Sequence, residues 1–210
     1  MRRYRFQQVD VFTNVPYKGN PVAVVLDSAG ISTAEMQAIA NWTNLSETTF
    51  VEPPQNPAAD YRLRIFTPRA ELPFAGHPTI GSAYAVLQSG HTPRTPGSLV
   101  QECGKGLIDL RLAGDRLFFR LPPPEFKAAG EKQIADAAAA LGVPASAIVR
   151  AAIVDVGPVW FTIQLPDGGT VTSLRPDMAA IAALSGSSLT GLNVFGFQGL
   201  VHNMHMHDMR

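Results

Sequence analysis

Residues 64–83 read RIFTPRAELPFAGHPTIGSA, and they place a strand, a loop and the start of a helix in one segment. The segment from Tyr61 to Thr67 predicts a strand with two different faces: residues 61, 63, 65 and 67 (Tyr, Leu, Ile, Thr) alternate with residues 62, 64 and 66 (Arg, Arg, Phe). We predict that a helix starts at Pro78, with proline in its first position, and ends near Gln88, before Gly90. This helix is apolar or small on every side, so we expect the fold to enclose it.

The start of that helix is the first candidate site. Helix N-termini present backbone N–H groups and favour carboxylates, and Gly76 would let a ligand approach the backbone closely. His77 can donate a hydrogen bond or transfer a proton near neutral pH. The alternative interpretation is structural: His77 caps the helix and Gly76 turns the chain.

A second candidate is Glu47, in the segment LSETTFV from Leu45 to Val51. A glutamate that points into a cleft at the start of an apolar strand would be partly desolvated. Its pKa would then rise toward the range that suits proton transfer. The alternative is a solvated turn residue.

Composition excludes several classes of protein. The 210 residues carry 17 basic and 17 acidic side chains, so neither a nucleic-acid groove nor a charged tail is indicated. Hydrophobic residues make up 46% of the chain, which permits a large core. Cys103 is the one cysteine, which excludes disulfides. Without an apolar run of about 18 residues or a signal-peptide pattern, we expect a soluble cytoplasmic protein that does not bind membranes.

The chain also carries an internal similarity. A strand, a helix and a phenylalanine follow each other in residues 19–50, and again with similar spacing in residues 157–195. Pro122-Pro123-Pro124 is the best linker candidate between two halves, residues 1–121 and 125–210. The alternative is that any two strand–helix units look alike. Two related halves would place a site in the cleft between them.

Three blocks together resemble one known family. DVFT and GNP-x-AVVL in residues 10–26, LSETTFV in residues 45–51, and the 64–83 segment are similar to the phenazine-biosynthesis PhzF-like isomerases. The resemblance implies an α/β (α+β) diaminopimelate-epimerase-like fold, in which two similar halves each curve a sheet around a central helix. It also implies a cofactor-independent isomerase that transfers protons on a small carboxylate-bearing substrate, which is trans-2,3-dihydro-3-hydroxyanthranilate in the best-understood members. Glu47 would be the general acid/base, while Gly76 and His77 would border the substrate. We expect a homodimer.

The second half departs from the family pattern. Its R-M-F-A-P stretch and E-D-P-A-T-G-S-A loop, which complete the site, are not found in full before Arg210. We therefore expect this half to be incomplete, without its own central helix. The alternative to an isomerase is then a catalytically inactive remnant or a binding protein. We expect the 210-residue chain alone to be inactive or nearly so, and either poorly stable as a monomer or self-associated. A cysteine racemase would need two thiols.

Three other features predict no chemistry. His202, His205 and His207 have a spacing that fits no common zinc pattern, so we expect a structural or disordered tail and no bound metal. The segment 104–106 predicts a hairpin turn rather than a phosphate loop. Trp42 and Trp160 are expected in the core.

Overall fold

A computed structural model describes residues 3–185, 189–198 and 203–209. The chain divides into two compact units, Met1–Pro122 and Pro123–Arg210, so the division falls inside the run of three prolines. In the described part of the chain, no helix combines the length and the apolar character needed to cross a membrane.

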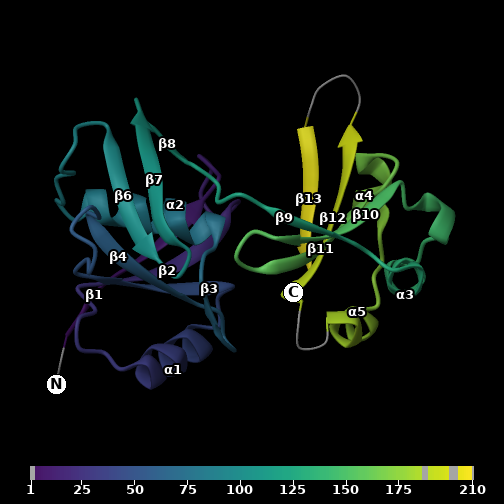
Figure 1. Ribbon diagram of the computed structural model, residues 1–210, viewed down its shortest axis with the longest axis horizontal. Helices are drawn as coiled ribbons and strands as arrows, with labels where there is room; N and C mark the ends of the chain where they lie inside the picture. Colours follow the sequence, from purple (N-terminus) through teal and green to yellow (C-terminus); the bar gives the residue numbers. More distant parts are fainter. Residues whose placement is uncertain (1–2, 186–188, 199–202, 210) are drawn as a thin grey trace. The chain divides into compact units, whose positions relative to one another are not determined.

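The first unit is one curved, mixed sheet with two helices (Figure 1). Its strand order is β1-β2-β3-β4-β6-β7-β8, and the short β5 pairs with β4. The elements are β1 (Arg5–Val11), β2 (Asn20–Leu26), α1 (Thr33–Thr43), β3 (Glu47–Glu52), β4 (Tyr61–Phe66), β5 (Glu71–Leu72), α2 (Gly76–Gln88), β6 (Ser98–Cys103), β7 (Gly106–Ala113) and β8 (Arg116–Phe119).

The sheet surrounds α2, as the all-round apolar pattern predicts (Figure 1). This helix contacts β1, β2, β3, β4, β6 and β8. Its small residues, among them Gly81, Ser82 and Ala85, are buried, whereas Tyr84 is 48% exposed. The closest approach of helix to sheet therefore falls on the small face, where no bulky side chain separates the two backbones.

The predicted start of α2 is wrong by two residues. The helix begins at Gly76, after the extended N-cap residue Ala75, so Pro78 is the third helical residue instead of the first. Proline is tolerated there because the first four N–H groups of a helix have no partner within it. At the other end, Gly90 has a φ of 93°, and its N–H donates to Leu87 O. A glycine in this left-handed conformation terminates the helix, as predicted.

Helix α1 covers the opposite face of the same sheet. Ser32 caps it, and Glu35 completes the capping box by accepting from the Ser32 backbone N–H at 2.9 Å. Met36 and Ala40 pack with Phe50 in a second core cluster. Trp42 corrects an expectation, because it lies on the outer side of this helix and is 84% exposed.

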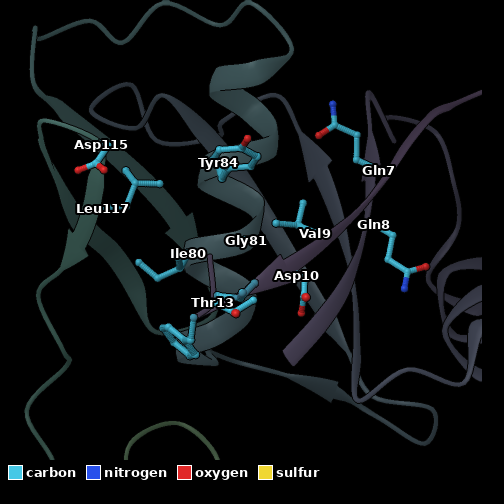
Figure 2. Close-up of a pocket in the computed structure, with 12 residues that line it drawn as sticks. Gln7, Gln8, Val9, Asp10, Thr13, Ile80, Gly81, Tyr84, Asp115 and Leu117 are labelled. Atoms are coloured by element: carbon cyan, nitrogen blue, oxygen red, sulfur yellow. The ribbon is translucent and has the colours of Figure 1, made fainter. Parts of the chain in front are cut away.

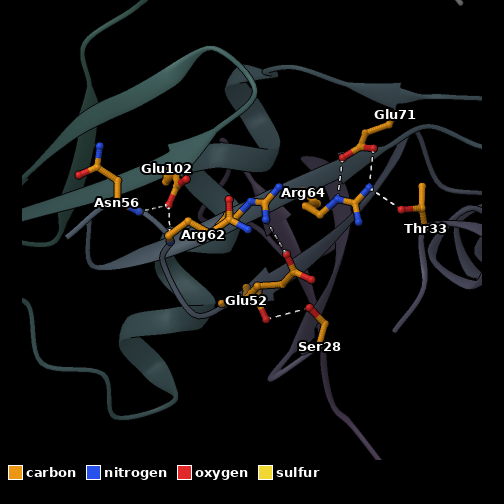
Figure 3. Close-up of polar contacts among 10 residues, drawn as sticks. Ser28, Thr33, Glu52, Asn56, Arg62, Arg64, Glu71 and Glu102 are labelled. Atoms are coloured by element: carbon orange, nitrogen blue, oxygen red, sulfur yellow. Dashed lines mark hydrogen bonds and ion pairs between the residues drawn. The ribbon is translucent and has the colours of Figure 1, made fainter. Parts of the chain in front are cut away.

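Arginines on the outer face of β4 tie neighbouring elements together (Figure 3). Arg64 donates to both carboxylate oxygens of Glu71, at 2.8 and 2.6 Å, and to Thr33 Oγ1 at the start of α1. Arg62 lies 3.6 Å from Glu52 on β3. The alternation predicted for β4 thus separates charged side chains from a buried apolar row.

The second unit contains a smaller sheet with the strand order β13-β12-β11-β10-β9, and part of it repeats the strand pattern of the first unit. The first two strands of this sheet, β10 and β11, are antiparallel and correspond to β1 and β2. A helical crossover, which corresponds to α1, leads to β12, which is parallel to β11 and corresponds to β3. The last strand, β13, is antiparallel to β12 and corresponds to β4. The two units are therefore similar in topology. Their elements are β9 (Glu125–Ala128), α3 (Glu131–Leu141), the 3₁₀ turn Ala145–Ala147, β10 (Arg150–Asp155), β11 (Val159–Gln164), α4 (Gly168–Ser173), α5 (Met178–Ser185), β12 (Gly191–Gln198) and β13 (Asn203–Met209).

The two faces of this smaller sheet differ. Helices α3, α4 and α5 contribute buried residues to one cluster with Phe161 and Val194 on one face. On the other face, Phe126, Val154 and Trp160 lie side by side across β9, β10 and β11, and Phe126 is 69% exposed. All described helices of this unit thus pack on one side, in contrast to the first unit.

Of the two alternatives expected for the histidine-rich segment, a structural or a disordered tail, the described residues favour the structural one. Residues 203–209 form β13, in which His205 and His207 pair in register with Gly196 and Val194 of β12. His202 lies outside the described residues.

Candidate active site

Glu47 is the first residue of β3, at the end of a tight connection from α1. Asn44 closes α1 in the left-handed conformation, with φ at 53°, which asparagine tolerates better than most residues. Ser46 then donates to Asn20 Oδ1 at 3.3 Å, which joins the connection to the start of β2. Because alternate side chains of a strand share a face, Glu47, Thr49 and Val51 lie on one side of β3 and Phe50 on the other. Phe50 packs in the α1 cluster and Val51 against the α2 core, so Glu47 lies on the α2 side.

Gly76 and His77 are the first two residues of α2. A Cβ atom at Gly76 would lie 3.2 Å from the Phe119 ring, so β8 packs closely against this first turn. The N-cap Ala75 provides no side-chain hydrogen bond to the helix. His77 belongs to the first turn itself, so the interpretation of this histidine as the helix cap does not hold.

The fold brings Glu47 and His77 together. His77 Nδ1 lies 3.2 Å from Glu47 Oε2, an ion pair whenever the imidazole is protonated. The Glu47 side chain is fully buried and that of His77 is 6% exposed. The alternative interpretation of Glu47 as a solvated turn residue is therefore excluded. A buried ionised carboxylate is costly unless another group compensates its charge, and a protonated imidazole is such a group.

Chemically, this pair has the components of an acid/base site. A proton can reside on the carboxylate or on the imidazole, and both lie beside the N-terminus of a buried helix, which favours negative charge.

A cavity of about 630 Å³ opens along the next turns of α2 (Figure 2). Ile80, Gly81 and Tyr84 form its helical wall, and Asp10 and Thr13 from the first sequence block line the strand side. Its volume lies in the range of small-molecule sites. None of Glu47, Gly76 and His77 is among the residues that line it.

Two other kinds of site, a reactive thiol and a metal centre, are not indicated by the described residues. Cys103 is a free, half-buried thiol, and burial raises its pKa, which disfavours the reactive thiolate. Among the residues whose side chains the structure describes, no cluster of three metal-ligating groups occurs. Lys105 lies in the turn between the paired strands β6 and β7, which confirms the predicted hairpin.

Sequence reasoning missed a pair of buried hydroxyls beside this site. Thr49 on β3 and Ser82 on α2 have their oxygens 2.8 Å apart, and both residues are fully buried. The sequence indicated only that Ser82 is small. A polar residue on the most buried face of an apolar helix was the available signal, since such a group needs a hydrogen-bond partner.

Comparison with known proteins adds a family relationship. Residues 9–206 match the sequence profile of the phenazine biosynthesis-like protein family, PhzC-PhzF. The chain is 43% identical over 208 residues to Antisense-enhancing sequence 1 of Schizosaccharomyces pombe, a match that covers 95% of this chain and 70% of that protein. It is 38% identical over 177 residues to the trans-2,3-dihydro-3-hydroxyanthranilate isomerase of Pseudomonas fluorescens, covering 83% of this chain and 62% of that enzyme.

A solved structure shows the same architecture. The phenazine biosynthesis protein of the PhzF family from Bacillus anthracis superposes with a TM-score of 0.77 at 25% sequence identity. The superposition covers 98% of this chain and 71% of that one. The chain thus spans roughly two thirds of the length of these relatives.

Proposed function

The chain belongs to the phenazine biosynthesis-like (PhzC-PhzF) family, and from this premise we propose that it is a cofactor-independent isomerase of a small carboxylate-bearing metabolite. The isomerase named in Pseudomonas fluorescens supports the reaction class. The observation that carries the proposal is the buried contact of 3.2 Å between Glu47 Oε2 and His77 Nδ1.

In the proposed reaction, Glu47 is the general acid/base. Its carboxylate takes a proton from a substrate carbon, the C–H electron pair moves into the conjugated system, and the resulting carboxylic acid returns a proton to another carbon. No atom is gained or lost, so no co-reactant is needed. His77 compensates the Glu47 charge, and the first-turn backbone at Gly76 borders the substrate carboxylate, which a helix N-terminus favours.

A binding protein without turnover is the second candidate. The observation in its favour is that the cavity of about 630 Å³ is lined by residues other than Glu47, Gly76 and His77. A ligand held there would make contact with Asp10 and Tyr84 and would not need the acid/base pair.

The test is proton exchange in D₂O with trans-2,3-dihydro-3-hydroxyanthranilate as the probe, followed by mass spectrometry and NMR. Glu47→Gln should abolish deuterium incorporation and leave binding largely intact, because the amide keeps the shape and loses the base. Glu52→Gln is the matched control, since Glu52 lies on the same strand and pairs with Arg62. Equal loss of binding and exchange in Glu47→Gln would assign Glu47 a structural role. Binding by the native chain without exchange would favour the second candidate.

A further inference from the structure

Two buried hydroxyl groups connect the strand of Glu47 to the helix of His77. Thr49 Oγ1 and Ser82 Oγ lie 2.8 Å apart, and Thr49 Oγ1 also donates to Ala23 O of β2 at 3.2 Å. A hydroxyl has one proton, so with that of Thr49 directed at Ala23 O, Ser82 is the donor to Thr49. This short chain of hydrogen bonds runs from α2 through β3 into β2.

The hydroxyl pair and the Glu47–His77 pair join the same two elements. Thr49 follows Glu47 by two residues on the same face of β3, a spacing of about 7 Å along the strand. Ser82 follows His77 by five residues, about 7.5 Å along the helix axis. The two contacts therefore join one strand to one helix at similar separations along their axes, and His77 and Ser82 lie about 140° apart around the helix.

The surroundings of these links are apolar and small. Gly81 packs against Val22 and Val11, contacts that keep the helix close to the sheet without a directional preference. A hydrogen bond, in contrast, constrains both distance and angle. The Thr49–Ser82 bond is thus a directional contact between β3 and α2, in addition to the acid/base pair.

We propose that Thr49 and Ser82 are positioning residues, which set the rotation and height of α2 so that His77 Nδ1 meets Glu47. The effect of this positioning on catalysis rests on the proposed function. The contact between His77 Nδ1 and Glu47, in contrast, can be measured without turnover. Ser82→Ala is the cleanest variant, since Thr49 keeps its bond to Ala23 O and no donor is left without a partner.

The chain offers a matched control on the same helix. Thr79 Oγ1 accepts from Gln101 Nε2 at 3.1 Å, and both residues are fully buried. This bond holds α2 to β6 instead of β3. Thr79→Val removes a buried hydroxyl at equal depth and leaves the Gln101 amide without that acceptor, so it should lower stability at least as much as Ser82→Ala.

The experiment follows the imidazole ¹⁵N signals of His77 in the full chain, assigned with His77→Asn and calibrated with Glu47→Gln. Ser82→Ala should move the His77 signals toward those of Glu47→Gln, and Thr79→Val should not. In the exchange assay, Ser82→Ala should lower kcat by about 10- to 100-fold with little change in KM, because the acid/base pair is misplaced.

Two further variants keep the test decisive if Ser82→Ala does not fold. Thr49→Val should act like Ser82→Ala, and Thr49→Ser, which retains the hydroxyl, should restore the native His77 signals. The proposal is overturned if the signals stay unchanged in Ser82→Ala and Thr49→Val, or if Thr79→Val moves them equally. A native chain that shows no exchange would contradict the proposed function alone, since the ¹⁵N measurement decides the positioning role independently.

Discussion

At the scale of single residues, close backbone approach explains why α2 tolerates little change. A Cβ atom on Gly81 would lie 2.4 Å from Val22 Cγ1 and 2.8 Å from Val11 Cγ2. Gly81→Ala must push these strands or the helix aside, and we expect it to lower the free energy of unfolding by about 1–3 kcal/mol in urea titrations. In combination with Val22→Ala, which removes the nearer methyl group, the loss should be smaller than the sum of the two single losses. Strict additivity would mean that the two side chains do not collide.

At the scale of an element, α1 shows how local chemistry positions a functional strand. Its capping box determines where the helix begins, and Asn44 determines where it ends, three residues before Glu47. Ser32→Ala removes the acceptor for the Glu35 N–H, so we expect a loss of about 1 kcal/mol in unfolding free energy, measured by chemical denaturation.

Glu35, the other residue of the capping box, provides the control. Glu35→Gln should change stability by a few tenths of a kcal/mol, because glutamine can also accept from the Ser32 N–H, whereas Glu35→Ala should cost clearly more. Equal losses for both Glu35 variants would contradict a working capping box.

At the scale of the whole molecule, alkaline pH should destabilise the fold through Tyr61. This phenol is buried and donates to Gln101 Oε1, and burial raises its pKa above the ordinary value of 10.0. In the unfolded chain the phenol loses its proton near its ordinary pKa, whereas the native chain retains it. The stabilising contribution is therefore complete below pH 10 and declines as the pH rises above it.

Denaturant titrations between pH 8 and 11 check this expectation. The free energy of unfolding should fall above pH 10, and Tyr61→Phe should give a shallower decline from a lower starting stability, since it loses the bond to Gln101. The same slope in both proteins would assign the alkaline sensitivity to other groups.

The features that depend on local chemistry and on family motifs could be predicted from the amino-acid sequence. Alternation predicted β4, the all-round apolar pattern predicted an enclosed α2, and the three blocks indicated the family to which the chain belongs. These patterns are readable because periods of 2 and 3.6 residues set which side chains share a face. Glu47, Gly76 and His77 were likewise selected as candidates from sequence alone.

The contacts between these parts follow from tertiary packing and could not be predicted from the sequence. Glu47 and His77 are separated by 30 positions in the chain, and their contact exists because α2 packs closely on the sheet, with the small Gly81 against Val22 and Val11. The same packing pairs Thr49 with Ser82 and leaves Tyr84 exposed. No local pattern encodes such contacts, because their free energy comes from the burial of surfaces that are distant in sequence. The start of α2 is a second case, since the sequence pattern around Pro78 does not reveal that the helix begins at Gly76, where its first turn packs closely against Phe119.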